Sequence, residues 1–150
     1  MRNALCVCLL IAFALPALPA ESTDAKDIES AVLGVYNVIS GPAGPRDWEH
    51  FKALFADGAR LGSLRDGKLT LMTPDDYIAR AQPHFDKDGF FEKPVETRID
   101  QFKDIAHVTS RYESRRAAAD EKPFARGVNH FELARIGGQW RVVSIIWQQE

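Results

Sequence analysis

The segment that most constrains the fold is the last predicted strand pair, RGVNHFELARIGGQWRVVSIIW, from Arg126 to Trp147. Two runs rich in β-branched and aromatic residues flank Gly137-Gly138, a pair that suits a two-residue hairpin turn. The second run is apolar on both faces, which is typical of a strand covered on both sides. The segment therefore predicts an antiparallel hairpin in the middle of a curved sheet that wraps around a pocket.

The first twenty residues have the pattern of a secretory signal peptide. Arg2 gives a positive start, an almost unbroken apolar run covers Leu5 to Leu15, and small residues and prolines lead to Ala20. We expect cleavage after Ala20, which leaves residues 21–150 as one exported domain, periplasmic or secreted. The apolar run is too short to anchor in a bilayer, so no membrane association is expected after cleavage. A lipoprotein signal at Cys8 is excluded because Cys8 lies inside the apolar run.

The composition of the expected mature domain excludes several classes of function. Both cysteines leave with the signal, so disulfides, thiolate nucleophiles and thiolate metal sites are excluded. Loss of Arg2 leaves 18 of the 19 basic residues against 21 acidic ones, a net charge of −3, which gives no overall attraction to nucleic acid. The four histidines lack metal-type spacing, and no phosphate-binding loop or nucleophile elbow is present. We therefore expect no metal, no cofactor and no nucleic-acid partner.

Two periodic apolar stretches early in the mature chain predict helices. The first runs from about Asp24 to Ser40, and the glycines and prolines of residues 41–45 end it. The second starts at Asp47, and Asp57-Gly58 stops it. Its apolar side carries four residues: Trp48, Phe51, Leu54 and Phe55. We expect the apolar faces of both helices to pack on a concave sheet.

A hairpin and a third helix follow. Asp66-Gly67 is a favoured two-residue hairpin turn. Thr73-Pro74 supplies a good N-cap and a proline suited to the first helical position. Tyr77 lies on the buried side of this helix, and Pro83 should end or kink it near Gln82.

From Phe90 onward, apolar and polar residues alternate with a period of two, which predicts half-buried antiparallel strands. Val95, Thr97 and Ile99 alternate with Glu96, Arg98 and Asp100. The covered faces of the later strands carry Val108, Ser110, Tyr112, Asn129, Phe131 and Leu133. These faces offer no carboxylate, and Asp100, Glu113 and His130 fall on the opposite face by parity. A β-bulge would reverse that parity.

Five segments together resemble a known family. They are AVLGVYNVISG, DWEHFKALFADGARL, TPDDYIARA, IAHVTSRYESRR and the closing RGVNHFELARIGGQWRVVSIIW. On these segments the chain resembles the nuclear transport factor 2-like superfamily, in its SnoaL-like branch. The resemblance implies a cone-shaped α+β domain, in which three N-terminal helices pack on a strongly curved, mostly antiparallel sheet that encloses a pocket. It also implies a homodimer formed through the sheet. The superfamily holds isomerases, cyclases, epoxide hydrolases, dehydratases and transport adaptors, so the fold does not settle the function.

The leading functional hypothesis is an apolar pocket that binds a small hydrophobic or aromatic molecule. This hypothesis rests on the surplus of aromatic residues on the helix faces and the curved sheet. Core packing is the competing interpretation for each of these side chains. The candidate ligand-binding residues are Trp48, Phe51, Phe55, Tyr77, Tyr112, Asn129, Phe131 and Trp147.

Two alternatives remain open. One is an acid–base enzyme of the isomerase, dehydratase or cyclase type, which requires a titratable group inside the hollow. The covered faces supply no such group, so no catalytic residue is identified. The other is a dimeric interaction module without a ligand, which pairs two copies through the outer face that carries Arg111, Glu113, His130 and Glu132.

Overall fold

The computed structural model describes residues 23–150, and the predicted signal peptide lies outside the described residues. In chain order, the elements are α1 (Thr23–Ile39), α2 (Trp48–Ala53), β1 (Phe55–Arg65), β2 (Lys68–Met72), α3 (Pro74–Phe85), β3 (Phe91–Phe102), β4 (Ile105–Arg115), β5 (Ala125–Ile136) and β6 (Gln139–Gln149). Three helices and one six-stranded sheet make up this part of the chain. The predicted α+β class, with helices packed on a curved sheet, is confirmed.

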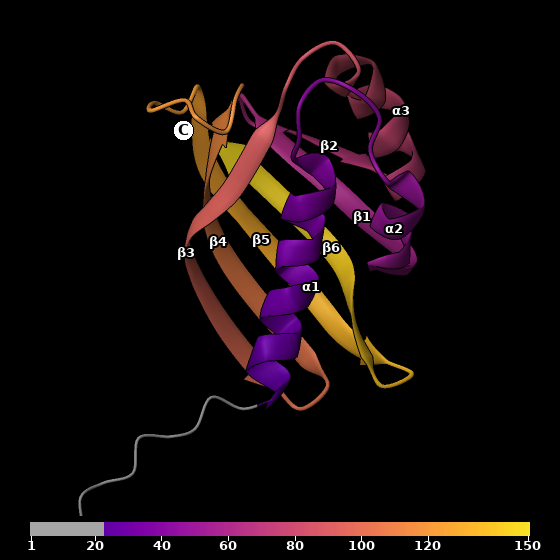
Figure 1. Cartoon of the computed structure of the whole chain (residues 1–150). Coiled ribbons are helices and arrows are strands. Elements are labelled where there is room, and N and C mark those ends of the chain that lie inside the picture. Colours follow the sequence, from indigo (N-terminus) through magenta and orange to yellow (C-terminus); the bar gives the residue numbers. More distant parts are fainter. Residues whose placement is uncertain (1–22) are drawn as a thin grey trace, which may run out of the picture.

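The sheet has the strand order β2-β1-β6-β5-β4-β3. Neighbouring strands are antiparallel, except that β1 and β6 are parallel. The β5–β6 hairpin lies in the middle of the sheet, as its apolar pattern predicts. Gly137 and Gly138 have φ of 58° and 79°, and Asp66 and Gly67 have φ of 50° and 72°, the left-handed values that both turns require. Figure 1 shows the long strands curving, with all three helices on the same side of the sheet.

Helix α1 lies along the concave face of the sheet (Figure 1). Its apolar stripe is buried, with Ile28 at 0% and Val32 at 1% relative exposure. Val108 and Phe131, from the facing strands, are exposed by 0% and 1%. Burial of each such side chain contributes about 1.5–3 kcal/mol, so this contact fixes the helix on the sheet.

Helix α2 is shorter than its apolar pattern predicts. It ends at Ala53, and the expected stop at Asp57-Gly58 is wrong, because Phe55 already begins β1. Strand β6 explains the difference: the Val142 amide donates to the Leu54 carbonyl at 2.9 Å, and Phe55 pairs with Val142. Pairing with a central strand outweighs the local helical pattern.

Helix α3 begins as predicted and ends later than predicted. Thr73 accepts from the Asp76 amide while Asp76 accepts from the Thr73 amide, which completes a capping box, and Pro74 occupies the first turn. The predicted end near Gln82 is wrong, since the helix continues through Pro83 to Phe85. The buried ring of Phe85 stacks on Trp48 at 6.0 Å, which secures the last turn.

Candidate functional site

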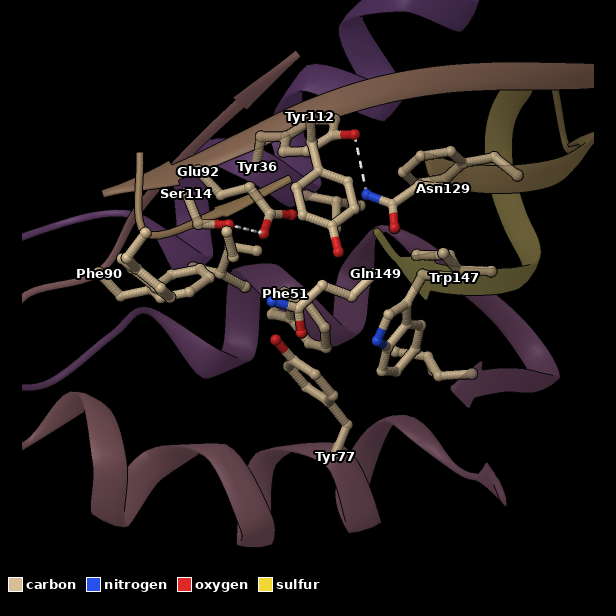
Figure 2. A pocket seen from close by; sticks show the side chains of 17 residues that line it. Tyr36, Phe51, Tyr77, Phe90, Glu92, Tyr112, Ser114, Asn129, Trp147 and Gln149 are labelled. Carbon is tan, nitrogen blue, oxygen red and sulfur yellow. Dashed lines mark hydrogen bonds between the residues drawn. The ribbon is translucent and has the colours of Figure 1, made fainter. Parts of the chain in front are cut away.

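A pocket of about 210 Å³ lies between the helices and the concave face of the sheet. Its walls are mostly apolar and aromatic, with a small number of polar groups. The lining residues are Val35, Tyr36, Ile39, Phe51, Leu61, Tyr77, Phe90, Glu92, Tyr112, Ser114, Phe124, Ala125, Asn129, Phe131, Ile145, Trp147 and Gln149. Figure 2 shows the hydroxyls of Tyr77 and Tyr112 pointing into this hollow from opposite walls. A concave apolar site with few polar groups is typical of small-molecule binding.

Six of the eight candidate residues from the sequence line this pocket. They are Phe51, Tyr77, Tyr112, Asn129, Phe131 and Trp147. Their role in binding a ligand stays a prediction.

Trp48 and Phe55 do not line the pocket. The ring of Trp48 packs against Phe51 and Phe85, with ring centroids 5.7 Å and 6.0 Å away. Phe55 is 7% exposed and lies 4.8 Å from the ring of Phe51, at the start of β1. Both side chains support the wall from behind. The sequence pattern placed Phe55 on a helix face, whereas Phe55 begins strand β1 and packs against Phe51 outside the hollow.

A buried polar network joins α1 to the sheet beside the pocket. The Asn129 amide donates to the Tyr36 hydroxyl at 2.9 Å, and that hydroxyl shares a 2.8 Å hydrogen bond with Ser110. All three side chains are at most 7% exposed. The Asn129 side chain is thus held in one orientation at the edge of the hollow. Burial raises the pKa of Tyr36 to about 12, so its hydroxyl keeps its proton.

The structure also places a carboxyl in the pocket, at Glu92 on β3. The expectation that the covered faces carry no carboxylate is therefore wrong. A β-bulge in β3 explains why Glu92 faces the pocket. Pro94 pairs with Tyr112 and Glu96 pairs with Arg111, so Val95 is an extra residue in the strand. The bulge reverses the alternation, so that Val95 is 53% exposed and Glu92 faces inward.

Hydrogen bonds with two serines hold Glu92 in place. The buried Ser114 hydroxyl donates to Glu92 Oε2 at 2.8 Å, which Figure 2 shows at the end of the hollow next to Phe90. Ser40, just after α1, accepts from the Glu92 amide at 3.0 Å and donates to the Glu92 carbonyl at 2.9 Å. The backbone and the carboxyl of Glu92 are therefore both fixed.

The surroundings of Glu92 change its acidity. Burial raises the pKa of Glu92 to about 7, and the hydrogen bonds from Ser114 and Asn129 favour the charged form and oppose this effect only in part. Burial, together with the nearby charge of Glu92, also raises the pKa of Tyr112 to about 12 and that of Tyr77 further. Near neutral pH the pocket therefore holds one carboxyl that can take up or release a proton, together with protonated tyrosine hydroxyls.

His130 lies on the outer face of the sheet, as its parity predicts. Its Nδ1 is 3.1 Å from Nε2 of His107, and His107 Nδ1 is 2.7 Å from a carboxylate oxygen of Glu132. Arg111 and Glu113 lie on the same face but pair with other residues, namely Glu96, Glu150, Arg115 and Arg126. Within residues 23–150, no cluster of three or more His, Cys, Asp or Glu side chains is arranged to hold a metal ion.

Comparison with known proteins identifies the family. A family model described as "Putative lumazine-binding" matches residues 42–148. The chain belongs to this family. Its fold is also shared by solved structures described as NTF2-like proteins, which agrees with the resemblance to the nuclear transport factor 2-like superfamily. A search of curated proteins gave no match.

Solved structures similar to this lumazine-binding family member share its fold at low identity. A Nostoc punctiforme protein of unknown function with a cystatin-like fold is 12% identical, with a TM-score of 0.70 over 89% of this chain and 96% of that chain. A "putative dehydratase" of the NTF2-like family from Streptomyces avermitilis is 13% identical (TM-score 0.65; 85% and 96% covered). A "putative ketosteroid isomerase" from Shewanella frigidimarina is 14% identical (TM-score 0.56; 85% and 95% covered).

The family description supports a ligand-binding domain, and the likeness to these solved structures shows the fold alone. None of the helices within residues 23–150 is long and apolar enough to span a bilayer.

Proposed function

We propose that this protein binds a small, mainly apolar ring molecule in the pocket between α1, α2, α3 and the sheet. The observation that carries the proposal is the hollow of about 210 Å³ with aromatic walls. An apolar cavity of about 150 Å³ is known to bind benzene, so a hollow of this size suits one or two fused rings. The family description agrees with a flat two-ring ligand such as lumazine.

A ligand screen with two matched variants tests this proposal. Thermal shift and native mass spectrometry are applied to the full-length protein with small ring compounds, lumazine included. Ala125 lines the pocket, so Ala125→Phe should fill it and abolish binding. Ala134→Phe, on the outer face of the same strand, should leave binding unchanged. The absence of any bound compound, or equal binding by both variants, would refute the proposal.

Glu92 favours a second candidate function, an acid–base enzyme of the isomerase or dehydratase type. With a pKa of about 7, the carboxyl is partly ionised at neutral pH and suits proton abstraction and return. The hydroxyls of Tyr77 and Tyr112 face the same hollow and can donate to an oxygen on which negative charge develops (Figure 2). In such a reaction, Glu92 would take a proton from a carbon next to a carbonyl and return it to another carbon.

Proton exchange tests the enzymatic candidate without knowledge of the natural substrate. Cyclic ketones found in the ligand screen are incubated with the protein in D₂O, and deuterium uptake next to the carbonyl is followed by NMR. Glu92→Gln should slow the exchange about 10²–10⁴-fold. Glu96→Gln, an exposed carboxyl on the same strand, should not slow it. Exchange at the uncatalysed rate with the native protein would rule out this chemistry for the ketones used.

We also propose that the domain acts after export, in the periplasm or outside the cell, as a homodimer formed through the sheet. The pattern of residues 1–20 supports export. Exposed apolar residues at one end of the outer face support the dimer, with Phe102 and Ile105 exposed by 69% and 60%. Light scattering should give twice the monomer mass, and Ile105→Asp should give the monomer. A monomer at high protein concentration would refute the dimer, and retention of residues 1–20 in the secreted fraction would refute signal cleavage.

A further inference from the structure

The charges around the pocket restrict which ligands it can accept. Among the described residues that line it, Glu92 is the one carboxylate, and none is Lys, Arg or His. An anionic ligand would therefore enter without a countercharge and would face the charge of Glu92. Burial of an unpaired charge is strongly unfavourable, so the pocket disfavours carboxylates and phosphates.

The aromatic walls favour the opposite charge. Phe51, Tyr77 and Trp147 form a continuous aromatic wall: Phe51 stacks on Tyr77 at 5.4 Å, and the Trp147 ring meets Tyr77 edge-on at 6.3 Å. Phe90 lies at the Glu92 end of the hollow (Figure 2). The faces of such rings attract cations, and they also bind flat apolar rings.

The polar atoms left over in the pocket also suit a hydrogen-bond donor. Ser114 donates to Oε2 of Glu92 and Asn129 also hydrogen-bonds the carboxyl, but each carboxylate oxygen has a second lone pair with which it can accept from a ligand. Asn129 uses its amide nitrogen on Tyr36, so its Oδ1 is an additional acceptor at the edge of the hollow. Two acceptor oxygens on one side and aromatic rings on the other match a group that combines a charged N–H donor with a ring.

We propose that the pocket selects a small ring-bearing amine, which binds as its ammonium ion with the nitrogen at Glu92 and the ring against Tyr77 and Trp147. This inference rests on the proposed binding function and adds the charge of the preferred ligand. Neutral rings of the same shape bind more weakly, and anions of the same shape bind least.

Three compounds with the same ring system test the inference. They are 2-naphthylmethylamine, 2-naphthylmethanol and 2-naphthoate, which are cationic, neutral and anionic at pH 7.5. Isothermal titration calorimetry on the full-length protein should show the amine bound about tenfold more tightly than the alcohol, and the alcohol more tightly than the naphthoate. Glu92→Gln should reduce amine affinity to that of the alcohol. Glu96→Gln, on the outer face of the same strand, should leave the order unchanged.

The outcomes separate this inference from the binding function on which it rests. Binding of the alcohol with equal or weaker binding of the amine would overturn the inference and leave the binding function intact. The same holds if Glu92→Gln keeps the amine preference. Failure of all three compounds to bind a folded protein would overturn both, and circular dichroism of each variant establishes that it is folded.

Discussion

At the scale of single residues, Glu92 is a carboxyl whose acidity the fold changes strongly. It is an acid enclosed by aromatic walls, and its pKa rises from 4.5 to about 7 because burial disfavours the charged form. Such a group weakens the fold when it is ionised. A residue retained at a cost in stability is typical of a functional site.

The stability of the protein should therefore fall as pH rises from about 4.5 to about 7. In this window the folded protein binds more protons at Glu92 than the unfolded chain does, so ionisation favours unfolding. A shift of this size corresponds to roughly 3 kcal/mol. Glu92→Gln should be more stable than the native protein at pH 8 by up to this amount and similar to it at pH 4.5. Urea denaturation at both pH values measures the free energy of unfolding. The same difference between the two proteins at pH 4.5 and at pH 8 would contradict the prediction.

Ser114 should tune the acidity of Glu92. Its hydroxyl donates to the carboxylate at 2.8 Å and lowers the pKa that burial raises. Ser114→Ala should therefore raise the pKa of Glu92 above about 7. The fold should be kept, because the substitution removes a single oxygen atom from a buried site. NMR titration of the Glu92 carboxyl carbon gives the value directly. Thr109→Ala, on the outer face of the same strand, is the control and should leave the pKa unchanged.

At the scale of elements, the bulge in β3 decides what the pocket contains. One extra residue, Val95, separates the inward position of Glu92 from the inward position of Ile99, which is part of the core. Strand β3 is the edge of the sheet, where bulges and prolines are tolerated. Residues 40–41 at the end of α1 then secure the bulged segment, since Gly41 and Phe90 exchange backbone hydrogen bonds of 2.7 Å and 3.0 Å.

Deletion of Val95 should remove the bulge and leave Glu92 in the pocket. Without the extra residue, Pro94 stays opposite Tyr112 and Glu92 stays opposite the buried Ser114, so the pairing with β4 becomes regular and Glu92 still faces inward. Carboxyl titration by NMR should therefore still give a raised pKa, and ligand binding should be kept. Val95→Ala keeps the number of residues and should also keep both properties. A pKa near the ordinary value of 4.5 in the deletion variant would contradict this register.

The sequence allowed prediction of those elements in which local and global preferences agree. The β5–β6 hairpin, the Asp66-Gly67 turn and the Thr73 capping box all carry short-range signals, and each is present. The end of α2 and the orientation of Glu92 were not predicted, because each depends on pairing with a distant strand. One signal for Glu92 was available: Pro94 lacks an amide donor, and a proline inside a predicted strand indicates an edge or a bulge.

At the scale of the whole molecule, the α1 contact and the hollow divide the concave face between stability and binding. The part of the sheet under the first half of α1 is filled by residues such as Ile28 and Val32. The other part, near Glu92, keeps a hollow of about 210 Å³ lined by the second half of α1, by α2 and α3, and by the strands. The close-packed core positions the pocket walls. Its packing contacts offset the contacts that are lost where the hollow remains unfilled.

Proton uptake and ligand binding should consequently be coupled across the molecule. The ionisable groups that line the pocket are Glu92 and the tyrosines Tyr36, Tyr77 and Tyr112, whose raised pKa values keep them protonated below pH 9. An ammonium ligand binds best to ionised Glu92, so the affinity for 2-naphthylmethylamine should rise about tenfold in total between pH 5 and pH 8, with most of the change between about pH 6 and 7. Calorimetry in buffers of different ionisation enthalpy should show proton release at pH 6 and almost none at pH 8. The neutral alcohol should show neither effect, and a pH-independent affinity for the amine would mean that its nitrogen does not lie at Glu92.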